Sequence, residues 1–245
     1  MLISTRAIVL KHYKYSENSI ICKIYTEELG IKSYLINNVH NKKSKIKIGL
    51  FQPLTLLDLV VYNKENKQLQ HIKEVSCTEP LMDIQFNILK STMALFIAEI
   101  VLKTIKEEET NPVLYSFIRD FIKNFEQVRE SYSDYHLIFL LNFTQYLGFY
   151  PKTESYSDMS YFDMIEGRFY LKRPLHSSYI ENQLSYYMHQ LLQIAYSDSK
   201  QLKLNGKIRQ QLLEKIIMYY KIHLEGIGTI HSAEILKMVF SDVKE

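Results

Sequence analysis

The stretch Gly30–Leu57, GIKSYLINNVHNKKSKIKIGLFQPLTLL, decides how the fold is interpreted. It begins as a strand of β-forming residues after a turn glycine, and a second apolar strand follows Pro53. The polar loop between them carries Lys42, Lys43, Lys45 and Lys47, and no Asp or Glu occurs from Leu29 to Leu57. A cationic loop between two barrel strands favours phosphate binding. The alternative is a solvated loop that protects a sheet edge.

The composition indicates a globular chain whose basic character lies near its N-terminus. The chain has 245 residues, 47% of them hydrophobic, which is enough for a real core. Residues 1–80 hold twelve Lys and Arg against seven Asp and Glu, a net charge of +5. The remainder holds 18 against 20, a net charge of −2. The basic surface is therefore expected on the N-terminal part.

Several functional classes lose support from the sequence. Cys22 and Cys77 stand far apart in expected strands, so both are assigned to core or sheet positions rather than a disulfide or metal site. No signal peptide or membrane span is expected. No glycine-rich phosphate loop, clustered metal ligands or nucleophile–base arrangement is found, so we expect no catalytic residue, small-molecule substrate, cofactor or metal.

The first 80 residues predict a small β-barrel. Five runs have strand character, at residues 3–12, 18–26, 30–36, 54–62 and 69–77. Five short strands in about 80 residues predict a Greek-key barrel of the OB type, with an SH3-like barrel as the alternative. Tyr13 and Tyr15, in the turn expected after the first strand, are the candidates for base stacking, and Lys11 and Lys14 beside them for DNA contact.

After Pro80 the hydrophobic period changes to that of helices. One helical face is expected to carry Phe86, Leu89, Met93, Ile97, Ile100 and Thr104. Asn111 and Asp134 are expected to cap later helices, and a small β-hairpin is expected at about 156–172. The predicted fold class is therefore α+β, with a barrel domain at 1–80 and a mainly helical domain at 81–245.

The order of short motifs resembles the bacterial RecO family of recombination mediators. In the N-terminal part the resemblance is carried by Ala7–Lys11, Tyr15–Ser19, Thr26–Gly30, Lys43–Lys45 and Gln52–Leu54. Beyond it, Leu147–Pro151 and the final helix near Ser232 also fit. The resemblance implies an OB barrel followed by a helical domain.

The resemblance also implies a function in DNA repair. It implies a nucleoid-associated protein that binds single- and double-stranded DNA and anneals complementary strands, and the two cysteines, not expected to form a disulfide, fit a reducing cytoplasm. With the partner RecR, it would help load RecA onto DNA coated with the single-strand-binding protein SSB. The family's DNA-binding role is carried over only to Lys43 and Lys45, with Lys42 and Lys47 added from charge and spacing.

Two departures from the family pattern are visible. Many members carry a four-cysteine zinc module, whereas this chain has Tyr156 and Met159 where the first cysteine pair is expected. No zinc is therefore predicted, and the hairpin is expected to rest on Tyr161, Phe162 and Phe169. The basic loop uses lysine where relatives often use arginine, which favours backbone tracking over base readout.

The SSB tail, which the resemblance implies is acidic and apolar, needs an apolar groove with cations at its rim. Lys207, Arg209 and Lys215, on the helix expected at 207–224, are the candidates. Ordinary solvated charges on a core helix are the alternative. An RNA-binding OB protein and a non-catalytic protein-interaction scaffold remain alternatives for the whole chain.

Overall fold

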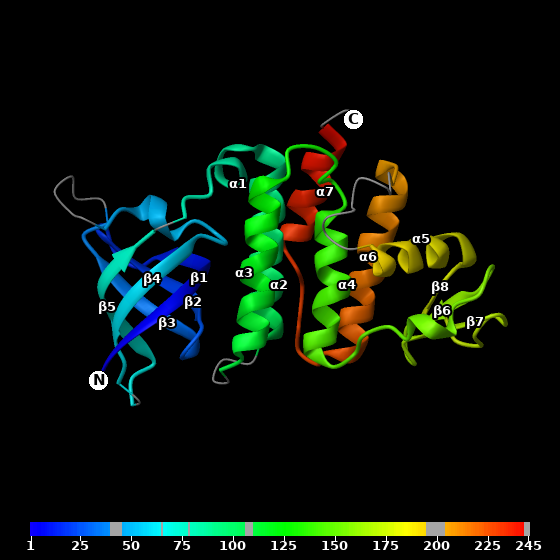
Figure 1. Ribbon diagram of the computed structural model, residues 1–245, viewed down its shortest axis with the longest axis horizontal. Coiled ribbons are helices and arrows are strands. Elements are labelled where there is room, and N and C mark those ends of the chain that lie inside the picture. The colour runs from blue at the N-terminus through cyan, green and yellow to red at the C-terminus, as the bar shows by residue number, and fades with distance from the viewer. Residues whose placement is uncertain (40–45, 65, 78, 106–109, 195–203, 243–245) are drawn as a thin grey trace. The chain divides into compact units, whose positions relative to one another are not determined.

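Five strands between Leu2 and Ser76 form a closed barrel, drawn in blue to cyan in Figure 1. The computed structural model describes the chain except for residues 40–45, 65, 78, 106–109, 195–203 and 243–245. The strands are β1 (Leu2–Lys14), β2 (Ser19–Thr26), β3 (Gly30–Asn37), β4 (Leu56–Tyr62) and β5 (Leu69–Ser76). Their order, β1-β2-β3-β5-β4, confirms the OB-type Greek-key barrel.

The barrel closes through two different pairings. β1 is long enough to pair with β2 along its second half and with β4 along its first half. β3 and β5 pair in parallel over a short stretch, from Ser33↔Leu69 to Leu35↔His71. A bulge between Val9 and Lys11 bends β1 between its two partners.

The barrel interior is filled by alternate residues of the strands. The buried core cluster comprises Ala7, Val9, Ile20, Cys22, Ile24, Tyr34, Ile36, Val39, Phe51, Leu57, Leu59 and Val61. Phe51 comes from the short 3-10 helix η1 (Ile48–Phe51), which follows the basic loop. Cys22 is a fully buried free thiol, which agrees with its predicted core position.

Three helices belong to the same compact unit as the barrel: α1 (Met82–Phe86), α2 (Ile88–Thr104) and α3 (Pro112–Gln127). Asn111 caps α3 as predicted, because its Oδ1 accepts a hydrogen bond from the Leu114 amide at 2.9 Å. The single helix expected through Phe86 was wrong. The Asn87 side chain accepts bonds from the amides of Leu89 and Lys90 and starts a new helix there.

The second compact unit comprises residues 128–229 and 237–245. Its elements are α4 (Tyr135–Leu147), η2 (Thr153–Ser155), β6 (Tyr161–Asp163), β7 (Arg168–Tyr170), β8 (Tyr179–Ile180), α5 (Asn182–Gln193) and α6 (Gly206–His223). The last helix, α7 (Ser232–Asp242), is shared between the two units. The boundary expected after residue 80 marks the change from strands to helices, and as a domain boundary it remains a proposal.

The predicted hairpin is present as β6 and β7, and β8 joins it to make a three-stranded sheet of order β7-β6-β8. The sequence missed β8 because its two residues are too few to show an alternating pattern. Gly148 ends α4 with a φ of 86°, which favours glycine. None of the helices in the described part of the chain combines the length and apolar composition that a membrane span needs.

Candidate nucleic-acid interface

Strand register places two rows of side chains on the outer surface of the barrel. Cys22, Ile24, Tyr34 and Ile36 point into the core, so their neighbours along β2 and β3 point outward. One outward row is Lys11↔Lys23↔Ser33 across β1, β2 and β3. The next row is Tyr13↔Ile21↔Leu35↔His71, which reaches β5. Cations and apolar side chains therefore lie in adjacent rows on one face.

Tyr13 and Lys11 form an exposed aromatic–cation pair on this face. The Tyr13 side chain is 43% exposed. The Lys11 Nζ lies 5.1 Å from the centroid of the Tyr13 ring, which is a cation–π distance. The expectation that Tyr13 and Lys14 lie in a turn was wrong. β1 continues through both residues because they pair with Ile21 and Ile20 on β2.

Another outward row, Ile8↔Tyr25↔Ile31, is covered. All three side chains are at most 2% exposed, and the Tyr25 ring lies 5.8 Å from Tyr115 of α3. Helices of the same unit therefore occupy this side of the barrel. The Lys11 and Tyr13 rows are the part of the β1–β2–β3 surface left open to a ligand, and strands 2 and 3 are where OB folds bind oligonucleotides.

Tyr15 and the root of the basic loop lie at one end of the barrel. Tyr15 is 62% exposed in the turn between β1 and β2. The Val39 amide, at the start of the loop, donates to the Asn18 carbonyl of that turn at 3.1 Å. Ser19 Oγ also donates to Asn37 Oδ1 at 2.8 Å. Lys14, the last residue of β1, belongs to this end as well.

The basic loop itself is described only in part. Lys42, Lys43 and Lys45 lie outside the described residues, whereas Lys47 is exposed immediately before η1. The segment after Lys47 is firmly anchored, because Phe51 is fully buried and its carbonyl lies 2.9 Å from His12 Nδ1. Lys47 is therefore carried on a fixed support at the barrel end.

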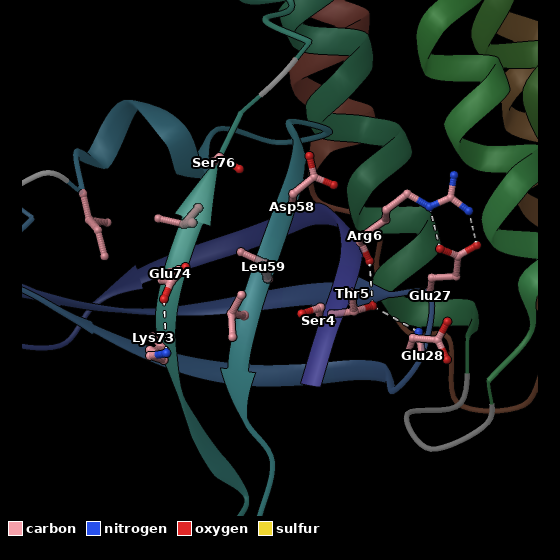
Figure 2. A pocket seen from close by; sticks show the side chains of 13 residues that line it. Ser4, Thr5, Arg6, Glu27, Glu28, Asp58, Leu59, Lys73, Glu74 and Ser76 are labelled. Atoms are coloured by element: carbon pink, nitrogen blue, oxygen red, sulfur yellow. Dashed lines mark hydrogen bonds and ion pairs between the residues drawn. The ribbon is translucent and has the colours of Figure 1, made fainter. Parts of the chain in front are cut away.

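A large open cavity on the barrel, of about 820 Å³, has the wrong charge for nucleic acid. Figure 2 shows the acidic side chains Glu27, Glu28, Asp58 and Glu74 around it, with Arg6 and Lys73. Arg6 is already neutralised by Glu27, to which its Nε donates at 2.6 Å. Four carboxylates against two cations repel phosphates, so we do not assign this cavity to DNA.

The three cations of the tail hypothesis do not share one site. Lys207 and Arg209 line a cavity of about 310 Å³ with Lys237, Leu213 and Phe240. Lys215 lines a different cavity, and its Nζ donates to the Tyr179 carbonyl at 3.2 Å. The sequence could not reveal Lys237, because it comes from the next helix, α7.

Arg209 is a buried structural cation rather than an exposed one. It is 5% exposed, and its Nε donates to Asp134 Oδ1 at 2.7 Å. Asp134 precedes α4 as predicted, but its carboxylate makes no cap bond and binds Arg209 instead. Burial and the nearby Arg209 lower the pKa of His136, which also lines this cavity, to about 3. Of the two predicted cations that line this cavity, Lys207 and Arg209, Lys207 is the exposed one.

The hairpin region does not fit a zinc module. The Tyr156 ring stacks on His189, with centroids 3.7 Å apart and planes within 6°. Phe162 and Phe169 are buried, as the sequence predicted, and Phe169 packs against Tyr156. Tyr161, the third residue of that prediction, is only partly buried and packs against Tyr179. Among the described residues, no three side chains of metal-ligand type come together. The absence of zinc stays a prediction, which elemental analysis would contradict by finding about one zinc per chain.

Comparison with known proteins gives matches along nearly the whole chain. The family model described as Recombination protein O N terminal matches residues 1–81. The model described as Recombination protein O C terminal matches residues 85–231.

Three relatives that are matched over their full length have the same name, DNA repair protein RecO. The chain is 38% identical over 247 residues to a DNA repair protein RecO of Flavobacterium psychrophilum. It is 34% identical over 240 residues to one of Azobacteroides pseudotrichonymphae, and 34% identical over 241 residues to one of Bacteroides fragilis. In each case the match covers 98% of this chain and 100% of the relative.

Proposed function

The chain belongs to the RecO family of DNA repair proteins, and from this premise we propose that it is a recombination mediator that binds DNA through its barrel. It binds single and double strands, anneals complementary strands, and with RecR helps load RecA onto SSB-coated DNA. The observation that carries the proposal is the open face of β1, β2 and β3. There, rows of lysines and apolar side chains lie near the barrel end that carries Lys14, Tyr15 and Lys47.

The chemistry of this face suits a phosphate backbone with exposed bases. Lys11, Lys14 and Lys47 supply charges that attract phosphates without reading sequence. Tyr13 and Tyr15 supply rings on which bases can stack whatever their identity. Binding that does not depend on sequence is what a protein needs when it must pair any two complementary strands.

Strand annealing on SSB-coated oligonucleotides tests the proposal. The wild-type chain should accelerate pairing of two complementary strands coated with SSB. Replacing Lys11, Lys14 and Lys47 with Ala should slow it, because fewer phosphates are neutralised. Lys123→Ala, which removes a lysine already paired with Glu79 at 2.7 Å, serves as the control. A wild-type chain without annealing activity, or one that prefers matched RNA, would overturn the proposal.

For the SSB tail we propose the cavity between α6 and α7. Its apolar wall contains Leu213 and Phe240, and Lys207 supplies an exposed cation. Lys237 also lines the cavity, but its ammonium is paired with Glu214. An acidic, apolar peptide matches that combination in both polarity and charge. Lys215 is not part of this site, because it lines another cavity.

A fluorescent tail peptide titrated against the full chain tests this cavity. Lys207→Glu should weaken binding by roughly 10-fold, because a charge contact becomes repulsive. Lys215→Glu is the matched control on the same helix and should have little effect. The opposite ranking of these two variants would place the tail at the cavity beside Lys215 instead.

A further inference from the structure

Phe86 is a large apolar side chain left open at the end of α1. It is 78% exposed, which is unusual for phenylalanine. It lines a groove of about 420 Å³, a volume typical of small-molecule sites. The groove is lined by Gly49, Gln52, Pro53, Ile84, Gln85, Phe86, Ser91, Ala94 and Leu95.

The backbone that carries Phe86 is held on both sides. Before it, the Glu126 carboxylate accepts hydrogen bonds from the amides of Asp83 and Ile84, at 2.8 and 2.9 Å. After it, Asn87 caps α2. The backbone of the groove is therefore already ordered before a ligand binds, so binding costs little backbone entropy and the Phe86 ring is held in place for it.

The groove combines an aromatic ring with two amide side chains. Gln85 Nε2 donates to Thr55 Oγ1 at 3.2 Å, which holds this amide at the wall. Gln52 lines the same groove and is exposed. A glutamine amide has two N–H donors and a carbonyl acceptor, so Gln52 and the part of Gln85 not bonded to Thr55 can match the edge groups of a nucleobase. An apolar side chain placed here would instead cover the exposed Gln52 amide without offering it a hydrogen bond.

The charge around the groove also favours a nucleic acid. Among the residues that the structure describes, no carboxylate lines it, in contrast to the four around the barrel cavity in Figure 2. Asp83, on α1, is 2.5 Å from the buried ammonium of Lys90 and is neutralised by it. Lys47, a proposed phosphate contact, precedes the groove residue Gly49 by two positions, so the groove adjoins the proposed path of the DNA backbone.

We propose that this groove holds one unstacked base of a bound single strand, with Phe86 stacked on its face and Gln52 and Gln85 at its edge. The inference rests on the proposed function, because it needs a strand that the barrel already holds. The site lies off the strand surface of the barrel, on the first helix after it. This site would contact a base by stacking and hydrogen bonding rather than by charge.

Equilibrium binding of the full chain to two labelled strands tests the site. One strand carries normal bases, and the other has the same length with its central bases removed. Phe86→Ala should weaken binding to the normal strand by roughly 10-fold, because one stacking contact is lost. Binding to the abasic strand and the salt dependence should not change. Phe86→Trp should keep the preference for bases, and Phe86→Leu should lose it.

Ile88→Ala is the matched control, since Ile88 is 64% exposed nearby but does not line the groove. Equal weakening by Ile88→Ala and Phe86→Ala would assign this corner to a general apolar contact with a protein and overturn the base site. So would a Phe86→Ala variant that keeps the full preference for bases. A wild-type chain that binds neither strand would overturn the proposed function itself.

Discussion

Lys90 is a lysine with no exposed surface, and its ammonium connects three helices. Its Nζ lies 2.5 Å from Asp83 Oδ2 on α1 and donates to the Phe125 carbonyl, near the end of α3, at 2.6 Å. The sequence could not reveal this contact, because lysines are seldom fully buried and the pattern assigns them to the solvent face. The interaction becomes visible only when the partners from two other helices are placed around α2.

Replacing Lys90 with Met should lower the free energy of unfolding by roughly 3–5 kcal/mol. The apolar side chain fills the space but leaves the Asp83 carboxylate without its ammonium. Urea denaturation measures the loss. Lys123→Met is the control, because Lys123 and Glu79 form an exposed pair worth at most about 1 kcal/mol. Similar losses in the two variants would contradict a buried, connecting role for Lys90.

Phe86 shows why helical spacing of hydrophobic residues alone does not predict which of them are buried. Its spacing from Leu89 and Met93 predicts a shared buried face. The structure interrupts the helix at Asn87, so Phe86 is exposed while Met93 is fully buried. Asparagine is a strong N-cap, and its two hydrogen bonds to the following amides outweigh continuation of the hydrophobic pattern.

Among the elements, β1 shows most directly how register makes a surface. Alternation along the chain predicted the strand, but the bulge after Val9 and the pairing of Lys11 with Lys23 depend on the partner strand. A one-residue change in register would turn these side chains to the other face. The sequence therefore supplied the candidates Lys11 and Tyr13, and the barrel supplied their neighbours Lys23, Ile21 and Leu35.

Tyr13→Ala should weaken binding to single-stranded DNA by roughly 10-fold with an unchanged salt dependence, because a stacking ring is lost and no charge. Tyr186→Ala is a matched control. Tyr186 is 45% exposed, close to the 43% of Tyr13, but it lies on α5 in the second compact unit. Fluorescence anisotropy with a labelled oligonucleotide measures both variants. An equal loss of affinity in the two variants would show that the Tyr13 face does not bind the DNA.

The start of α7 depends on one carboxylate from α2. Glu99 accepts hydrogen bonds from the His231 amide at 3.2 Å and the Ser232 amide at 2.8 Å. Burial raises the pKa of Glu99, but the bonds from Ser232 and His231, with Lys103 nearby, outweigh burial and lower it. Because the pKa of Glu99 is lower in the folded protein than in the unfolded chain, the stability that its carboxylate contributes is present at neutral pH. That stability is lost as the pH falls below about 4.

Glu99→Gln should therefore lower the free energy of unfolding by about 1 kcal/mol at pH 7. The difference in the free energy of unfolding between the variant and wild type should shrink at acid pH, where Glu99 itself becomes neutral. Urea denaturation at neutral and acid pH measures both values. Glu225→Gln, at an exposed position after α6, controls for general charge effects. A gap that is equal at both pH values would contradict this role of Glu99.

For the whole molecule, the order of elements was predictable, and the sites were only partly so. Alternation before Pro80 and helical spacing after it predicted the barrel followed by helices, because burial imposes those periods. Arg209 shows what the sequence could not predict, because its partner Asp134, just before α4, is far away in the chain and holds Arg209 in a buried ion pair. Lys237 shows the same limit, because folding alone brings it beside Lys207.

The central claim is that the barrel binds single strands through its lysines, and the salt dependence of binding tests it most directly. Affinity for a single-stranded oligonucleotide is measured over a range of salt for wild type and for a variant with Lys11, Lys14, Lys42, Lys43, Lys45 and Lys47 replaced by Ala. Each lost phosphate contact should reduce the log–log slope by roughly 0.7, so the six should reduce it by about 4. A variant with the wild-type slope would contradict the claim.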